Sequence, residues 1–242
     1  MCKMNKDTIT DPRDGNVYRT VQIGAQCWLA ENLKYLPSVC PATTTPDGSA
    51  FYYVYDYQGY SVEEAKAAAN FQNYGVLYNW PAARESCPPG WHLPSDVEWS
   101  ELTDFLIRTQ KRITASNVGY ALRSRRQVGS PLGGEWNTDE HPRWERLSRP
   151  VVSGLAAIRR MAVDFIYRTR MGHGTDEIGF SALPGGRCSY GGFYRIGDLG
   201  YWWSSTDASL LRAWARQMIT GGTVNCWDMG KNYGYSVRCV RD

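Results

Sequence analysis

The chain has 242 residues and a net charge of +3, so it is long enough for one large domain or two small ones and too weakly basic to favour a nucleic-acid partner. Ten Trp, 16 Tyr and 24 Gly against only 6 Phe are typical of a loop-rich fold with amphipathic aromatic side chains, and they argue against a helical bundle. No stretch approaches the ~20 apolar residues of a membrane span, so we expect a soluble protein without a direct membrane span.

The N-terminal part predicts a β-hairpin followed by a long loop region. Asp14-Gly15 is a strong tight-turn signal, and β-favouring residues follow it, so we expect a strand over Val17–Ile23. From Lys34 to Gly59 the chain is rich in Pro, Thr, Ser, Gly and Tyr, which predicts loops that hold one short aromatic strand.

Two capping-box signatures predict the two main helices. Ser61 and Glu64 indicate the start of a short helix, and Ser95 and Glu98 indicate a longer helix over about residues 96–109. In a capping box the Ser side chain accepts a hydrogen bond from a free amide at the helix start while the Glu side chain reaches back. Both starts are therefore fixed by local hydrogen bonding.

The longer helix has one apolar face, formed by Trp99, Leu102, Phe105 and Leu106. This spacing favours core packing for Trp99 over a role as a ligand platform. The stretch from about residue 111 to 174 gives weaker signals: GYALRSRR predicts a strand, and VVSGLAAIRRMAVDFIYRTR is compatible with either a helix or a pair of buried strands.

The sequence contains no recognisable catalytic or metal-binding constellation. His92, His141 and His173 stand in unrelated contexts, which favours ordinary surface or loop positions over acid–base or metal chemistry. The seven cysteines lie far apart, without the CxxC spacing of a zinc site, and their odd number leaves at least one unpaired in a monomer. Cys2 after Met1 has two interpretations, the stump of a bacterial lipoprotein and an incidental cysteine. We expect no metal, no cofactor and no enzymatic activity.

The last quarter of the chain, 179–242, alternates framework phrases with unpatterned stretches. Short strands are expected over residues 213–219, 223–229 and 235–240, and their ladder hydrogen bonds do not depend on side-chain identity. Inward-facing side chains should hold the core, namely Trp202 or Trp203, Trp214 and Val237. The stretches between the strands lack a periodicity that would bury them, so we expect them to form a ligand-binding face.

Six phrases together match a known family in order and spacing. DGNVYRTVQIGAQCWLAENL, NYGVLYNWPAA, CPPGWHLPSDVEWSEL, GFSALPGGR, GYWWSST and YSVRCVRD resemble the Fibrobacter succinogenes major paralogous domain, common in surface proteins of Bacteroidetes. The resemblance covers most of the chain and implies one α+β domain over 1–242 with a C-type lectin-like fold, which has two main helices, short antiparallel strands, paired terminal strands and long loops. Residues from about 127 to 172 look like an atypical insertion.

The C-terminus is similar to the variable proteins of diversity-generating retroelements, in which a reverse transcriptase miscopies template adenines. An Asn codon mutated at its adenines reaches Tyr, Ser, Cys, Gly, Arg, Leu, Asp, Ala, Phe and Thr, among others, but never Trp, Met, Gln, Glu or Lys. Met218, Trp227 and Met229 lie outside this set, so we interpret them as scaffold or as products of other codons. The unpatterned residues lie inside it, namely Cys188, Ser189, Tyr190, Phe193, Tyr194, Asp198, Leu199, Ala208, Ser209, Leu210, Leu211, Gly221, Gly222 and Tyr233.

The resemblance implies a non-enzymatic ligand-binding or adhesion protein, at the cell surface of a bacterium, secreted, or on a phage virion as a tail receptor-binding protein. Its partner would be a protein or glycan receptor on a target cell. We expect one exposed patch formed by Tyr190, Phe193, Tyr194, Leu210, Leu211 and Tyr233. The full set of expected ligand-binding residues is Ser189, Tyr190, Phe193, Tyr194, Asp198, Leu199, Ala208, Ser209, Leu210, Leu211, Arg216, Thr220, Trp227, Asp228 and Tyr233.

Two alternatives remain, a purely structural surface domain and an enzyme of the formylglycine-generating type. The enzyme would need a metal and a reactive cysteine pair, for which Cys188 and Cys226 are the candidates near the face. A calcium-dependent sugar site is not indicated, because the sequence lacks a Glu-Pro-Asn or Trp-Asn-Asp phrase. The fold resemblance also implies that Cys87 and Cys239 lie close enough for a disulfide in an oxidising compartment, whereas assembly in the cytosol would keep them as thiols.

Overall fold

The computed structural model describes residues 7–124, 144, 174–219 and 222–242. The described residues form two five-stranded sheets and a two-stranded sheet, with five helices in the first half of the chain. This architecture confirms the predicted α+β class. The expected insertion over about 127–172 lies outside the described residues, except for the buried Trp144.

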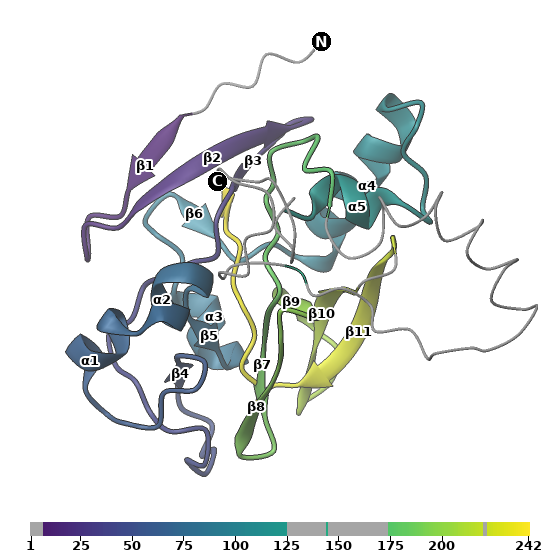
Figure 1. Cartoon of the computed structure of the whole chain (residues 1–242). Helices are drawn as coiled ribbons and strands as arrows, with labels where there is room; N and C mark the ends of the chain where they lie inside the picture. The colour runs from purple at the N-terminus through teal and green to yellow at the C-terminus, as the bar shows by residue number, and fades with distance from the viewer. Residues whose placement is uncertain (1–6, 125–143, 145–173, 220–221) are drawn as a thin grey trace, which may run out of the picture.

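The first sheet unites the two ends of the domain. Its strands follow the order β1-β2-β3-β12-β6. Their bounds are Thr8–Thr10 for β1, Val17–Ile23 for β2, Gln26–Leu29 for β3, Trp91–His92 for β6 and Val240–Arg241 for β12. The bounds of β2 confirm the predicted strand, and Val240 of β12 pairs antiparallel with both Trp28 and His92. The C-terminal strand β12 therefore lies between β3 and β6, in the same sheet as the N-terminal strand β1 (Figure 1).

The second sheet is built from the last quarter of the chain in the order β11-β10-β9-β7-β8. Its strands are β7 (Gly185–Ser189), β8 (Gly192–Ile196), β9 (Gly200–Asp207), β10 (Arg212–Met218) and β11 (Val224–Gly230). The strands expected over 213–219 and 223–229 are thus confirmed to within one residue. The β7–β8 hairpin projects from this sheet toward the loop that precedes β4 (Tyr52–Tyr53), which pairs with β5 (Leu77–Tyr78) (Figure 1).

The longest helix begins as the sequence predicts. The helices are α1 (Val62–Ala67), α2 (Ala69–Tyr74), α3 (Trp80–Glu85), α4 (Asp96–Thr109) and α5 (Val118–Leu122). At the start of α4 the Glu98 amide donates to the Ser95 hydroxyl, and the Ser95 amide donates to the Glu98 carboxylate over 2.7 Å. Trp99 is fully buried, as its place on the apolar face predicts.

Only half of the first capping box forms. The Ser61 hydroxyl accepts from the Glu64 amide, but the Glu64 carboxylate accepts from the hydroxyl of Tyr57 instead of reaching back to Ser61. Tyr57 itself takes the Ser61 amide hydrogen. The expected single helix is also interrupted at Ala68, whose extended backbone separates α1 from α2.

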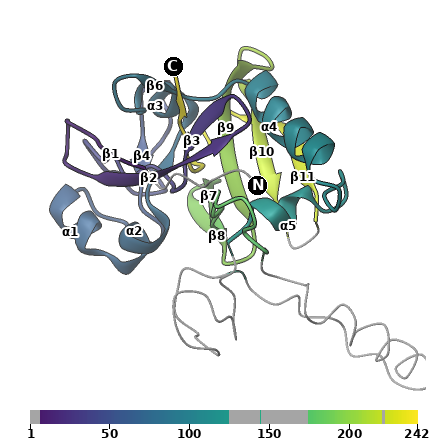
Figure 2. The ribbon, with the colours of Figure 1, turned by 90° about the horizontal axis from the view of Figure 1, so that it is seen from above.

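Two hydrophobic cores lie on opposite faces of β9. Trp203 belongs to the core that also contains residues of β5 and α3, and Trp202 belongs to the core beneath α4. Because adjacent residues of a strand point to opposite faces, the Trp202-Trp203 pair anchors both cores at once. Figure 2 shows α4 and α5 covering the side of the second sheet that carries β10 and β11. Both tryptophans are fully buried, as expected for at least one of them.

Trp214 does not lie in the core, contrary to our expectation. It is only half-buried and belongs to neither core, whereas its neighbours Ala213 and Ala215 pack into the core beside Trp203. The register explains this, because Trp214 pairs with Asp228 while Ala215 pairs with Trp203. The alternation of β10 therefore turns the small residues inward and Trp214 to the face that α4 covers incompletely.

The segment 235–240 is not the continuous strand that we expected. Tyr235 forms a single bridge with Tyr78, Ser236 forms one with Trp202, and regular pairing begins at Val240. The segment crosses from the second sheet to the first, so it cannot keep one partner strand. On the way, the buried Arg238 side chain donates hydrogen bonds to the backbone carbonyls of Leu29, Phe180 and Ser181 (2.6–3.0 Å).

The stretch GYALRSRR also differs from expectation, because its first four residues belong to α5 and not to a strand. Gly119 explains the difference: its amide donates to the carbonyl of Gly222 over 2.7 Å, and an added Cβ would meet that oxygen at 2.8 Å. A contact distant in the sequence therefore holds this helix in place. The last two residues of the phrase lie outside the described ranges.

Cys87 and Cys239 form a disulfide with Cα atoms 5.9 Å apart, which confirms the predicted pairing. Cys27, Cys40, Cys188 and Cys226 are free. None of the helices in the described ranges has the length and apolar character needed to cross a bilayer.

Candidate ligand-binding face

One residue from each strand of the second sheet forms a row across the sheet face that also carries Trp203 and Ala215. Trp227 donates from its indole N–H to the Gln217 side chain over 3.2 Å, and Gln217 donates to the hydroxyl of Tyr201 over 2.9 Å. The Arg187 guanidinium lies 5.6 Å from the ring centroid of Tyr201 and 5.9 Å from that of Tyr194. We call these five residues the sheet row. Its two ends are exposed, with Trp227 at 51% and Tyr194 at 43%.

The tip of the β7–β8 hairpin carries a residue that fits its turn poorly. Tyr190 and Gly191 both have positive φ angles, 51° and 75°, as in a two-residue type I′ turn. Asn, Asp and Gly favour this geometry, whereas the left-handed conformation costs other residues roughly 1–2 kcal/mol. The Tyr190 side chain is nevertheless 80% exposed, so little burial offsets the cost.

A chain of aromatic rings connects the hairpin tip to the sheet row. Tyr190 lies against Tyr233 with ring centroids 5.2 Å apart, and the Tyr233 ring lies 6.3 Å from that of Tyr235. Tyr235 in turn stacks on Tyr201, at 4.8 Å and an interplanar angle of 13°. Burial, reinforced by Tyr190, raises the pKa of Tyr233 to about 12. The Tyr233 hydroxyl is therefore uncharged at neutral pH.

A pocket of about 300 Å³ opens beside this hairpin tip, and we call it the hairpin pocket. It lies between the tip, the loop 42–46 and residues 232–233. Its lining consists of Ala42, Thr43, Thr44, Thr45, Pro46, Tyr53, Cys188, Ser189, Tyr190, Gly191, Asn232 and Tyr233. The hydroxyl of Ser189 is buried there without a hydrogen-bond partner within the described protein.

The turn between β9 and β10 adds two exposed leucines to the same end of the sheet. Leu210 is 88% exposed and Leu211 is 74% exposed, and Ala208 and Ser209 beside them are exposed as well. The amide of Lys231 donates to the Leu211 carbonyl over 2.9 Å, which holds this turn against the segment that leads to Tyr233. The predicted patch is therefore assembled in part, from Tyr190, Tyr194, Leu210, Leu211 and the half-buried Tyr233.

Several expected site residues lie elsewhere. Phe193 points to the opposite face of the hairpin, where its ring packs 5.2 Å from that of Tyr55, because alternate residues of β8 face opposite sides. Leu199 packs against the core that contains Trp203, and the partly exposed Asp198 pairs with Arg195 over 2.9 Å at the base of the hairpin. The structure therefore does not bring Phe193, Leu199 and Asp198 together with Tyr190 on one exposed patch. Thr220 lies outside the described residues.

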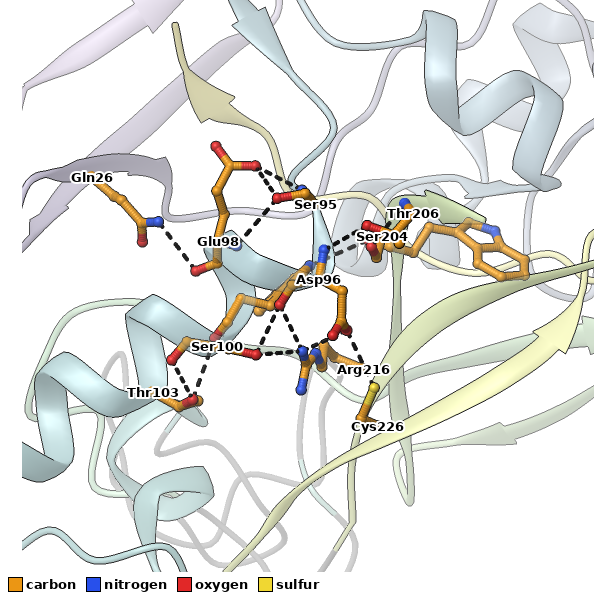
Figure 3. A network of polar contacts seen from close by, with 12 residues as sticks. Gln26, Ser95, Asp96, Glu98, Ser100, Thr103, Ser204, Thr206, Arg216 and Cys226 are labelled. Carbon is orange, nitrogen blue, oxygen red and sulfur yellow. Dashed lines mark hydrogen bonds and ion pairs between the residues drawn. The ribbon is translucent and has the colours of Figure 1, made fainter. Parts of the chain in front are cut away.

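Arg216 was expected among the ligand-binding residues, but it is 7% exposed and lies beneath the start of α4 (Figure 3). Its guanidinium donates to the Asp96 carboxylate over 2.5 Å and to the Ser100 hydroxyl over 3.0 Å. The Cys226 thiol lies 3.2 Å from the same carboxylate. These contacts join β10 and β11 to α4, so Arg216 belongs to the scaffold. Asp228 stays on the surface, where it pairs with Arg212 over 2.7 Å.

Sequence reasoning missed the residues that complete the site from outside the variable stretches. The loop 42–46 and Asn232 line the hairpin pocket, and Arg187 and Gln217 connect the sheet row. For Gln217 an available signal was a polar residue at the same alternate spacing as Ala213 and Ala215. No local signal marks the loop 42–46, because only the tertiary fold brings it to the hairpin.

The two cysteines considered for catalysis lie on different strands, β7 and β11, with β9 and β10 between them. Burial raises the pKa of Cys188 to about 12 and that of Cys226 to about 11, so both are protonated thiols and weak nucleophiles. Among the described residues, no group of three His, Cys, Asp or Glu side chains is arranged to hold a metal ion.

The family model of the Fibrobacter succinogenes major domain matches residues 21–241. The chain belongs to this family. No curated protein and no solved structure gives a match. Both the hairpin pocket and the sheet row lie inside the matched range, so the candidate face is part of the Fibrobacter succinogenes major domain itself and not of an appended segment.

Proposed function

We propose that this protein is a non-enzymatic binding module that displays a diversified face, as the variable proteins of diversity-generating retroelements do. The observation that carries the proposal is Tyr190, a large aromatic side chain that is 80% exposed at a turn position where it costs stability. Unfavourable backbone conformations persist most often where function requires them. Tyr190 is therefore best explained by what it contacts outside the domain.

The backbone around the face supports this function, because it is held without help from the exposed side chains. β10 pairs with β11 over seven residues and with β9 on its other side. The Trp202-Trp203 pair of β9 anchors the same sheet from within. Substitutions at the hairpin tip and the β9–β10 turn would leave these interactions intact.

The C-type lectin-like fold is part of the proposal. It is supported by the pairing of β12 with β3, by the disulfide that ties the terminal segment to the residues before α4, and by the location of the candidate face in the excursion between the paired ends. We infer display at a bacterial cell surface or on a phage tail, where an oxidising environment preserves the disulfide.

The partner that we propose is a protein or glycan receptor on a target cell. Tyr, Ser, Gly and Asn dominate binding surfaces of antibodies, because rigid aromatic area and adaptable polar groups bind many partners at low entropic cost. Tyr190, Tyr194, Tyr233 and Asn232 supply such groups, and the exposed leucines of the β9–β10 turn extend the apolar area.

Sequencing the 3′ end of the gene in many cells of one population tests the proposal. Substitutions should cluster in the codons of exposed positions such as Tyr190, Tyr194 and Leu210, and should be rare in the codons of Trp202, Trp203 and Val237. The neighbouring DNA should carry a reverse transcriptase gene and a near-repeat that differs at adenines. Variation spread evenly over framework and exposed codons would contradict the proposal.

The rival enzymatic function receives no support from the protonated, separated thiols of Cys188 and Cys226. A purely structural role predicts that the exposed aromatic residues can be removed without consequence, and the binding tests below decide between this role and display.

A further inference from the structure

The hairpin pocket has the composition of a site for an uncharged polar ligand. Its twelve lining residues include no carboxylate, amine or guanidinium group. Burial raises the pKa of Cys188 and that of Tyr233 to about 12, and it also raises the pKa of Tyr53, so these groups are neutral at physiological pH. A charged ligand would find no opposite charge among them to compensate for its lost hydration.

Residues with hydroxyl or amide side chains line two sides of the space. Thr43, Thr44 and Thr45 lie on one side, and Ser189 and Asn232 lie on the other. The Ser189 side chain is 4% exposed, and its hydroxyl has no partner in the described protein. Buried polar groups are almost always hydrogen-bonded, so rotation of this side chain toward the pocket would give the hydroxyl a partner in a ligand that both donates and accepts.

One wall of the pocket is aromatic. The Tyr190 and Tyr233 rings meet at an interplanar angle of 58°, and so present a bent apolar surface next to the polar groups. A sugar ring has the matching character, because its hydroxyl groups lie around its rim and its C–H groups form an apolar face. Apolar peptide side chains match less well, since Ala42 and Pro46 are the only other apolar side chains in the lining besides the aromatic residues and Cys188.

We propose that the hairpin pocket binds a single neutral pyranose unit of a glycan, without a metal ion. The volume of about 300 Å³ is at the lower end of the ~300–1,000 Å³ found for small-molecule sites, which favours one ring over an oligosaccharide. The inference rests on the proposed display function and gives the chemistry of one subsite of that face. Neighbouring exposed residues, including Leu210, would contact the remainder of the receptor.

Titration calorimetry and saturation-transfer NMR with small glycosides test the inference. The neutral probes are methyl α-D-glucopyranoside, methyl α-D-galactopyranoside, methyl α-D-mannopyranoside and methyl N-acetyl-β-D-glucosaminide, each with and without EDTA. At least one should bind saturably in the millimolar range and be unaffected by EDTA. Methyl β-D-glucuronide and acetyl-phenylalanine amide serve as the acidic and apolar probes, and both should bind more weakly.

Ser189→Ala should raise the dissociation constant of the bound glycoside about 2- to 10-fold, because one hydrogen bond is lost. Its stability should not fall, since the hydroxyl has no partner within the described protein. Ser124→Ala is the matched control: that hydroxyl is equally buried and unpartnered but lies outside the pocket, so binding should not change. Tyr190→Ala removes an exposed wall of the pocket and should weaken binding without unfolding the domain.

Four results would overturn the inference: no saturable binding of any neutral glycoside, loss of binding in EDTA, tighter binding of the acidic or apolar probe, or equal effects of Ser189→Ala and Ser124→Ala. If no glycoside binds but variation in the gene clusters at exposed codons, the sugar subsite is rejected and the display function is retained. If a neutral glycoside binds saturably but variation is spread evenly over framework and exposed codons, the diversified face is rejected and the sugar subsite is retained.

Discussion

Cys87 is covalently bonded to Cys239, and this disulfide ties the segment before α4 to the residue before β12. The bond closes a loop with a sequence separation of 152 residues. Closing a loop of this size restricts the unfolded chain strongly, by roughly 4–5 kcal/mol in the chain-entropy description. The pair therefore stabilises the sheet that carries both ends of the domain.

Replacing both cysteines, in Cys87→Ala/Cys239→Ala, should lower the free energy of unfolding by about 3–5 kcal/mol in guanidinium titrations. Reduction of the unaltered protein should have a similar effect. Cys27→Ala is the control, since this half-buried thiol is free and its loss should cost much less. A midpoint that does not move on reduction would show that the bond is absent in solution.

Tyr190→Asn should stabilise the domain by about 0.5–1 kcal/mol, because Asn tolerates the positive φ of the hairpin turn far better than Tyr. The same change should weaken receptor binding. Tyr194→Asn is the matched control: it lies in β8, where Asn is a poor strand residue, so stability should fall. Thermal melts of the two variants give the comparison, and destabilisation by Tyr190→Asn would remove the main support for the display function.

Trp203 and Trp227 separate scaffold from display. Trp203 is fully buried and donates to the Tyr78 carbonyl over 2.7 Å, so Trp203→Ala should cost about 3–5 kcal/mol of folding stability. Trp227 is 51% exposed, so Trp227→Ala should change stability by about 0.5 kcal/mol. Its effect on receptor affinity should be larger, about 1 kcal/mol or more. Equal losses of stability in the two variants would refute the division.

His92 should make stability depend on pH. Burial alone would lower its pKa, but hydrogen bonds with Asp242 (2.6 Å) and Glu98 (2.8 Å) outweigh burial, and the pKa is raised. The pKa of His92 is about 6.5 in the unfolded chain and higher in the folded protein. Protonated His92 therefore contributes its full stabilisation at pH values below about 6.5, and this contribution is lost as the pH rises through the pKa of the folded protein.

Burial likewise opposes the ionised form of Glu98, but hydrogen bonds from Ser95 and His92 leave its pKa lowered. Its contribution is therefore lost in acid instead.

Unfolding free energies at pH 5.5 and pH 8 measure this effect. The unaltered protein should lose stability between the two values, and His92→Gln should lose less. Asp242→Asn removes one of the two carboxylate partners, so its pH dependence should fall between those of the other two proteins. Identical pH profiles for the unaltered protein and His92→Gln would exclude the effect.

The parts of the fold that could be predicted are those with local determinants. The bounds of α4 follow from Ser95, Glu98 and the spacing of its apolar residues, and β2 follows from its turn and alternation. The short α5 could not be predicted, because it depends on the contact of Gly119 with Gly222. The strand that contains Trp214 was predicted correctly. Which of its residues point inward depends on its pairing with β9 and β11, so the orientation of Trp214 could not be predicted.

The candidate site shows the same division. An exposed tip at Tyr190 and an exposed turn at Leu210 could be predicted, because those stretches have no periodicity that buries them. Phe193 and Tyr194 are adjacent and chemically similar, and only the strand register decides which of them faces solvent. The pocket itself depends on the loop 42–46, which the chain brings to the hairpin from far away in the sequence.

The segment 234–240 has a consequence for biosynthesis. Gly234 bridges to Cys188, Tyr235 bridges to Tyr78, and Val240 pairs with both β3 and β6, so this segment connects all three sheets. A chain emerging from the ribosome cannot close these contacts until residue 240 has left the exit tunnel. The aromatic residues of the hairpin and the turns are therefore synthesised before the framework that will hold them, and the nascent domain must be kept from aggregating in the meantime. Under the proposed display function, every variant of the face would pass through the same late closing step, so folding would depend mainly on the framework residues.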